Sequence, residues 1–374
     1  MRPLKNQMKI KLKSLLFLSF IFVYNNLFSQ QQEYPKSFNI ENKLPNIIFM
    51  IGDGMGLSQV TAGTYSNGNT SSLEEMEFVG LQKTHAHNRL VTDSAASGTA
   101  MACGEKTFNG VIGIDSKNKK LESILEYSIT KEYNTALIAT SSIVHATPAS
   151  FYANVISRRQ YEDIALQLRF HDINYFIGGG QKHFNRREDK RNLIKEMEGE
   201  GYTIVNNINN FKSSSSDKLG FFTYSDEPPQ KSMGRKPSLE LLVEATLEKL
   251  KSSNKPFFLM VEASQIDWGG HANDLPYIIS EFKEFNIAIK SALEYAKSDK
   301  NTLVVVTADH ETGGLAIKKG NLKKKSVTGD FTTIGHSGSM VPVFSYGPYS
   351  KLFTGIYENT AIYNKFKIAV DQTN

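Results

Sequence analysis

The chain alternates short apolar runs with longer segments of helical periodicity, and this alternation constrains the fold more than any other feature. Six runs have the length and residue types of buried strands: Ile47–Ile51, Thr135–Thr140, Tyr175–Ile177, Phe257–Val261, Leu303–Thr307 and Val343–Tyr346. Four segments have helical patterns: Leu121–Lys131, Arg159–Phe170, Ser238–Ser252 and Tyr277–Lys297. Such alternation is typical of βαβ units. We therefore predict an α/β fold, a three-layer α/β/α sandwich with a large, mostly parallel central sheet.

The first residues have the pattern of a secretory signal. Five basic residues precede the apolar run Leu15–Tyr24, which is short for a membrane span. We predict that residues 1–29 are a signal peptide and that the protein is periplasmic or secreted. The formal net charge is +5, but this segment alone carries five basic residues and no acidic one. The mature chain is then near neutral, which gives no reason to expect specific binding of nucleic acid.

The remainder, 30–374, is predicted to form a single catalytic domain without a transmembrane anchor. Its one cysteine, Cys103, excludes an intrachain disulfide and has the setting of a small buried residue. A lysine-rich stretch, Lys318–Lys325, is interpreted as a solvated hairpin within a short insert near 315–334.

A serine stands at the start of a predicted helix in the stretch Val91–Ala100, which reads VTDSAASGTA. Asp93 or Ser94 suits the N-cap, the following alanines favour helix, and Gly104 ends it. A hydroxyl group there lies beside free backbone N–H groups and the positive end of the helix dipole, where a phosphate group can bind. Taken alone, however, this stretch is better explained by a plain capping serine.

Four further motifs carry carboxylates and histidines, mostly just after predicted strands, where open α/β sheets bind ligands. They are Asn46–Gly56 (NIIFMIGDGMG), Phe257–His271 (FFLMVEASQIDWGGH), Leu303–Gly313 (LVVVTADHETG) and Gly335–Gly338 (GHSG). A dinucleotide-binding loop is the alternative for the first motif. It would need glycine at the position of Leu57, and a carboxylate would not face a pyrophosphate.

Together with the serine stretch, these motifs resemble those of the alkaline phosphatase family in order, spacing and residue types. The resemblance covers nearly all of the chain after the first forty or so residues. It implies hydrolysis of phosphate monoesters to inorganic phosphate and alcohol, through a phosphoserine formed at Ser94 beside two zinc ions and one magnesium ion. The implied ligands are Asp267, His271 and His336 for one zinc, Asp53, Asp309 and His310 for the other, and Asp53, Thr147 and Glu262 for magnesium.

The resemblance also implies roles for residues beside the metals. Arg158 lies eleven residues after Thr147, the family spacing for an arginine that binds two phosphoryl oxygens, and Asp93 is placed to hold it. His145 stands where many bacterial members carry aspartate, and we expect it to weaken the magnesium site from outside the ligand shell. Trp268 is expected at the substrate entrance, with plain packing as the alternative.

Two other functions remain open at this point. One is a superfamily phosphodiesterase, against which Arg158, Thr147 and Glu262 argue, because a diester offers one fewer charged oxygen. The other is a non-catalytic metal- or phosphate-binding protein, against which the complete set of nucleophile, arginine and ligands argues. A sulfatase would need a modifiable cysteine in the nucleophile motif, and Cys103 lies outside it. The expected partners are small phosphate monoesters and a second copy of the chain, since the family commonly forms homodimers.

Overall fold

The computed structural model describes residues 43–372, so the predicted signal peptide lies outside the described residues. Within this range ten strands form one sheet. Their order is β14 (Gly355–Glu358), β2 (Phe78–Lys83), β13 (Val341–Tyr346), β8 (Thr302–Thr307), β1 (Asn46–Gly52), β7 (Phe257–Ala263), β3 (Asn134–Ser142), β4 (Tyr175–Gly179), β6 (Leu219–Phe222) and β5 (Thr203–Val205). All paired neighbours run parallel except β13, which is antiparallel to both β2 and β8. The predicted mostly parallel sheet is confirmed, as are its six predicted strands.

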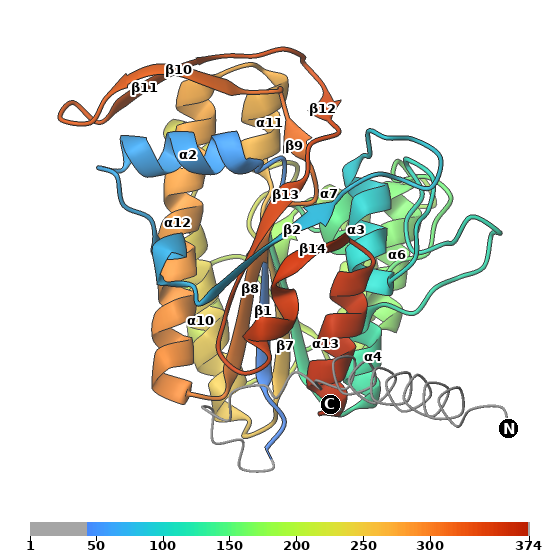
Figure 1. Cartoon of the computed structure of the whole chain (residues 1–374). Coiled ribbons are helices and arrows are strands. Elements are labelled where there is room, and N and C mark those ends of the chain that lie inside the picture. Colours follow the sequence, from blue (N-terminus) through green and yellow to red (C-terminus); the bar gives the residue numbers. More distant parts are fainter. Residues whose placement is uncertain (1–42, 373–374) are drawn as a thin grey trace, which may run out of the picture. The chain divides into compact units, whose positions relative to one another are not determined.

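Helices cover both faces of this sheet (Figure 1). One face packs against α3 (Ser94–Cys103), α4 (Ile124–Thr130), α5 (Ala146–Ala149), α6 (Tyr161–Phe170), α7 (Lys182–Asn185), α8 (Leu193–Gly199) and α13 (Ala361–Asp371). The other face packs against α2 (Leu57–Ser66), α9 (Ile208–Ser213), α10 (Leu239–Ser252), α11 (Gln265–His271) and α12 (Leu275–Asp299). Three short 3₁₀ turns are η1 (Ser72–Glu75), η2 (Lys231–Met233) and η3 (Ser350–Phe353). The predicted three-layer α/β/α architecture is therefore confirmed.

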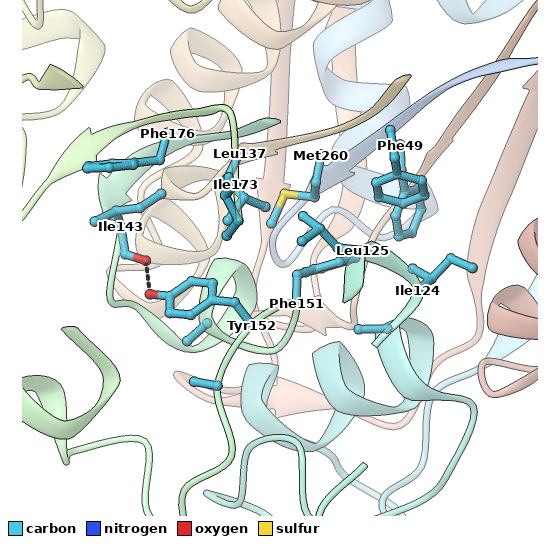
Figure 2. Close-up of a cluster of buried hydrophobic side chains, with 14 of the residues drawn as sticks. Phe49, Ile124, Leu125, Leu137, Ile143, Phe151, Tyr152, Ile173, Phe176 and Met260 are labelled. Carbon is cyan, nitrogen blue, oxygen red and sulfur yellow. Dashed lines mark hydrogen bonds between the residues drawn. The ribbon is translucent and has the colours of Figure 1, made fainter. Parts of the chain in front are cut away.

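Strand β1 shows why the sheet has an apolar core on each side. Its residues are all buried, and they alternate between the two core clusters: Phe49 belongs to one and Met50 to the other. Successive side chains of a strand point to opposite faces, so a continuous apolar run is what a strand covered on both sides requires. Figure 2 shows one of these clusters, in which Phe49, Leu137 and Met260 come from three adjacent strands, and the Tyr152 hydroxyl donates to the carbonyl of Ile143 (2.8 Å).

Two small antiparallel pairs lie outside the main sheet. Strands β10 (Ala316–Asn321) and β11 (Ser326–Asp330) form the predicted hairpin, whose lysines are exposed. Strands β9 (Glu311–Thr312) and β12 (His336–Ser337) pair His336 with Thr312 and Ser337 with Glu311. In the part of the chain that is described, no helix is both long and apolar enough to cross a membrane.

The residues after β7 form helix α11 rather than a glycine-rich loop. Its glycines serve packing: a Cβ on Gly269 would lie 2.9 Å from the backbone nitrogen of Ile278, and one on Gly270 would lie 2.8 Å from the carbonyl oxygen of Thr312. In a helix, Asp267 and His271 are four residues apart and share a face, which a loop would not guarantee.

Candidate active site

The candidate site lies along the carboxyl edge of four adjacent strands, β8, β1, β7 and β3. Asp53 directly follows β1, and Asp309 and His310 follow β8 within three residues. Glu262 is the second-last residue of β7, and His145 and Thr147 follow β3. Because these strands are parallel, their carboxyl ends meet at one edge. The sheet thereby gathers residues that are more than 200 positions apart in the sequence.

Helix α3 carries the candidate nucleophile to this edge. Asp93 is its N-cap, and its Oδ1 accepts a hydrogen bond from the Ala96 N–H at 3.0 Å, so Ser94 is the first helical residue. Ser94 is buried, and its Oγ lies 3.3 Å from Nε2 of His310. One turn later the Ser97 hydroxyl donates to the carbonyl oxygen of Asp309 at 2.6 Å. The helix start is therefore fixed against the residues that follow β8.

Arg158 reaches the same point from the other side. Its Nη1 donates to Oδ2 of Asp93 at 3.2 Å, and the same oxygen accepts from the Gly110 N–H at 2.9 Å. The predicted contact between Arg158 and Asp93 is thus present. Because the arginine side chain keeps 24% of its surface exposed, it has N–H groups left for a ligand.

Asp53, Asp309 and His310 form a fully buried group whose ligating atoms all lie within 4.8 Å of one another. His310 Nε2 is 3.0 Å from Asp309 Oδ2 and 3.6 Å from Asp53 Oδ1. Burial, followed by the neighbouring carboxylates, raises the pKa of Asp53 well above its usual value. Burial alone would also raise the pKa of Asp309, but the positive charge of the adjacent His310 outweighs burial and lowers it.

Asp267, His271 and His336 form a second group. His271 Nε2 and His336 Nε2 lie 3.1 Å apart, at 3.4 Å and 3.5 Å from Asp267 Oδ1. The Nδ1 atoms of the two rings lie against carbonyl oxygens, His271 against Ile334 at 2.6 Å and His336 against Thr92 at 2.8 Å. A carbonyl can only accept, so each Nδ1 carries the proton and each Nε2 presents a lone pair. Two lone pairs and a carboxylate facing one another are the arrangement a divalent cation stabilises.

The two groups are contiguous. The rings of His310 and His336 stack with centroids 3.5 Å apart, and Asp267, His310 and His336 also have ligating atoms within 4.8 Å of one another. Burial, followed by the proximity of His310, lowers the pKa of His336 to about 4. His336 is therefore neutral and available as a ligand at neutral pH.

A third group lies on the far side of Asp53, formed by Asp53, His145 and Glu262 with ligating atoms within 4.8 Å of one another. The Thr147 hydroxyl donates to Asp53 Oδ2 at 3.3 Å. Burial raises the pKa of Glu262 to about 7 and lowers that of His145 to about 4. His145 thus lies nearer to the carboxylates than we expected of an outer residue. The half-buried Trp268 ring packs edge to face against the His145 ring, with the two ring centroids 6.2 Å apart.

The unpaired atoms of these groups fit metal ions. Among the described residues, four buried atoms at this edge have no hydrogen-bond partner: Asp53 Oδ1, Asp309 Oδ2, Glu262 Oε1 and His145 Nδ1. Buried polar atoms are nearly always paired, and unpaired carboxylate oxygens are especially costly. A cation bound among them would satisfy these atoms and offset the crowded negative charge.

Sequence reasoning missed two residues that directly follow His310. Glu311 accepts from Gln59 Nε2 at 2.7 Å and from the Ser337 hydroxyl. Thr312 contacts Asp267 and His310. Both residues are buried. Their position beside a ligand pair was visible in the sequence, but their partners come from distant elements, and no local pattern marks them.

Known proteins resemble this chain in sequence over most of its length. The sequence model of the family described as "Alkaline phosphatase" matches residues 44–327. Alkaline phosphatase 3 of Bacillus subtilis (strain 168) is 35% identical, over 86% of this chain and 88% of its own length. Alkaline phosphatase 4 of the same organism is 41% identical, over 74% of this chain and 63% of its own length.

Solved structures agree. The alkaline phosphatase from the Antarctic bacterium TAB5 is 40% identical, with a TM-score of 0.84, and the match covers 89% of this chain and 100% of that one. Two variants of the TAB5 enzyme, in which one histidine is replaced by glutamate or by aspartate, are described with magnesium bound in a site named M3. Each has a TM-score of 0.82.

Proposed function

This chain belongs to the alkaline phosphatase family, whose members hydrolyse phosphate monoesters, and we propose that it acts through Ser94 as nucleophile at a site of two zinc ions and one magnesium ion. The observation that carries this proposal is the position of the Ser94 hydroxyl. It is buried at a helix N-terminus, 3.3 Å from Nε2 of His310, in the middle of residues that can hold a cation.

The donor atoms support the assignment of each metal. Asp267, His271 and His336 would hold one zinc, and Asp53, Asp309 and His310 the other, because imidazole with carboxylate suits zinc. Asp53, Thr147 and Glu262 would hold magnesium, which prefers oxygen ligands. Bound there, such cations supply Lewis acidity, which lowers the pKa of a nearby hydroxyl and offsets charge on the phosphoryl group.

During the reaction Ser94 would form a covalent bond to phosphorus, and Arg158 would bind the phosphoryl oxygens. The Ser94 oxygen loses its proton and bonds to phosphorus, while the bond from phosphorus to the ester oxygen breaks and the alcohol leaves with a proton. Water then attacks the phosphoserine, which releases inorganic phosphate and returns the proton to Ser94. Two successive in-line displacements give retention at phosphorus. Arg158, oriented by Asp93, would donate two N–H groups to phosphoryl oxygens throughout.

Two further residues would tune the site. We infer that His145 disfavours magnesium, because its imidazole stands where a carboxylate would add negative charge. The TAB5 variants, which hold magnesium in M3 after a histidine is replaced by a carboxylate, support this inference if M3 corresponds to the third group. Trp268, in contact with His145, would line the approach to the site.

The cellular setting is also proposed. The basic and then apolar composition of residues 1–29 supports export of the chain to the periplasm or the medium, followed by cleavage. Residues 30–374 would then form one catalytic domain, with the β10–β11 hairpin as its short insert. We further propose a homodimer, on the strength of family membership.

The test compares a chromogenic aryl phosphate monoester with the matching diester, alongside elemental analysis of the protein. We expect zinc and magnesium in the purified protein and much faster turnover of the monoester. Chelation should abolish activity, and zinc plus magnesium should restore it. Faster turnover of the diester would identify a phosphodiesterase instead. Bound metal without turnover of either ester would identify a binding protein.

A further inference from the structure

Thr312 lies between the two histidine-containing metal groups. It is the second residue of β9, opposite His336 in the two-residue ladder with β12, and it is fully buried. Room for it comes from Gly54, at which a Cβ would meet Thr312 Oγ1 at 2.8 Å and Asp267 Cα at 2.6 Å. Gly54 has a φ of 72°, which favours glycine as well. The loop after β1 therefore closes directly over the threonine hydroxyl.

The single hydroxyl of Thr312 touches one ligand from each group. Its Oγ1 lies 2.5 Å from Oδ1 of Asp267 and 3.2 Å from Nδ1 of His310. A carboxylate oxygen can only accept, so the hydroxyl proton goes to Asp267. The hydroxyl oxygen must then accept from His310, which places the ring proton on Nδ1.

This arrangement fixes how His310 presents its other nitrogen. With the Nδ1 proton bonded to Thr312, Nε2 is the nitrogen that would offer its lone pair to a bound cation. Nε2 is the atom that faces Ser94 Oγ at 3.3 Å and Asp309 Oδ2 at 3.0 Å. The same hydroxyl holds Asp267 Oδ1, the oxygen that lies within 3.5 Å of Nε2 of both His271 and His336. Hydrogen bonds of this kind orient metal ligands and set the tautomer of a ligating histidine.

We propose that Thr312 is a positioning residue that couples the two zinc sites, by donating to Asp267 and accepting from His310. The inference rests on the proposed two-zinc function. Removal of the hydroxyl would free the Asp267 carboxylate to rotate and would leave His310 Nδ1 without its acceptor. Both sites would then hold zinc less tightly, although Thr312 itself binds neither ion.

The test is competition for zinc between a chelator of known affinity and metal-free protein, for wild type, Thr312→Val and Thr312→Ser. Valine keeps the shape of threonine without the hydroxyl, whereas serine keeps the hydroxyl. We expect the valine variant to lose about 10- to 100-fold in affinity at each of two sites, the range typical when a partner of a metal ligand is removed. The serine variant should stay close to wild type.

Thr246→Val is the matched control. Thr246 is also fully buried, but its hydroxyl donates to the carbonyl of Leu242 within α10, away from the site. The proposal is overturned if Thr312→Val binds zinc like wild type, if only one site weakens, or if Thr246→Val weakens both sites equally. If the valine variant does not fold without metal, Thr312→Ala answers the same question. A wild type that does not bind two equivalents of zinc contradicts the proposed function itself, not the role of Thr312.

Discussion

The two halves of the candidate site differ in how firmly their imidazoles are held. On the histidine side, formed by Asp267, His271, Asp309, His310 and His336, each imidazole has a partner for Nδ1: two carbonyls and the Thr312 hydroxyl. On the oxygen side, formed by Asp53, Thr147 and Glu262 with His145, the Nδ1 of His145 and Oε1 of Glu262 have no hydrogen-bond partner among the described residues.

This difference has a physical consequence. Ligands that are already oriented lose little freedom when an ion binds, so the imidazoles of the histidine side are prepared for zinc before zinc binds. The oxygen side depends on the ion to offset its buried carboxylates, and an imidazole there replaces the charge a magnesium ion would prefer. We therefore expect the chemistry to depend on the histidine side and the metal content of the oxygen side to vary with conditions.

Replacing Ser94, whose hydroxyl lies against His310 of the histidine side, should have the largest effect on activity. Ser94→Ala should lower kcat for a phosphate monoester on the order of 10³- to 10⁶-fold, as loss of a nucleophile does in serine hydrolases, because no hydroxyl remains to form the ester. Metal content should not change. Ser128→Ala, which removes a buried hydroxyl bonded to Ile124 within α4, should keep full activity. Near-normal turnover by Ser94→Ala would rule out Ser94 as the nucleophile.

Arg158 would bind the phosphoryl group, although it belongs to neither half of the site. Arg158→Ala should reduce kcat/KM for the monoester by about 10²- to 10³-fold, the usual cost of removing a donor to the transition state. Hydrolysis of a diester should fall less, since fewer charged oxygens are available. Arg159→Ala is the control, because that neighbouring arginine is exposed. Equal losses of activity on both esters would argue against the binding of two phosphoryl oxygens by Arg158.

Replacing His145 sharpens the contrast between the halves. His145→Asp adds a carboxylate to the oxygen side and should tighten magnesium binding, by about tenfold on the scale of changes beside metal ligands. Added magnesium should then activate wild type more than the variant. The measurement is a magnesium titration of both proteins at fixed zinc. Superimposable curves, or tighter binding by wild type, would contradict the idea.

The smallest expected effect concerns stability without metal. Burial raises the pKa of Glu262 from 4.5 to about 7, so the folded chain holds this proton more tightly than the unfolded chain does. Ionisation of Glu262 therefore lowers the free energy of unfolding as pH rises from about 4.5 to about 7, and the full decrease persists above that range.

Metal-free Glu262→Gln should accordingly gain melting temperature relative to metal-free wild type across this pH range, by roughly 2–4 °C for each kcal/mol. Comparing the two proteins at each pH cancels the titration of the nearby histidines. With metals bound the order should reverse, since glutamine brings no charge to the cation. A difference independent of pH would show that Glu262 does not titrate in this way.

The sequence by itself determined the framework and most of the site. The apolar runs Ile47–Ile51 and Leu303–Thr307 have the short length and continuous apolar character of strands in a sheet covered on both faces, and both are such strands. Asp53 and Asp309 follow these runs, so their place at the sheet edge could be read directly. The helix start was equally local: the sequence narrowed its N-cap to Asp93 or Ser94, and the structure has Asp93 there.

Only the tertiary structure decided how these residues meet. Helix α11, rather than a loop, sets Asp267 and His271 on one face. His145 reaches the third group because β3 lies beside β7, which carries Glu262. Thr312 contacts Asp267 across 45 positions of sequence. A hydroxyl bridge of this kind depends on the packing of separate elements to within a fraction of an ångström, and periodicity, capping and turn residues fix only the elements themselves.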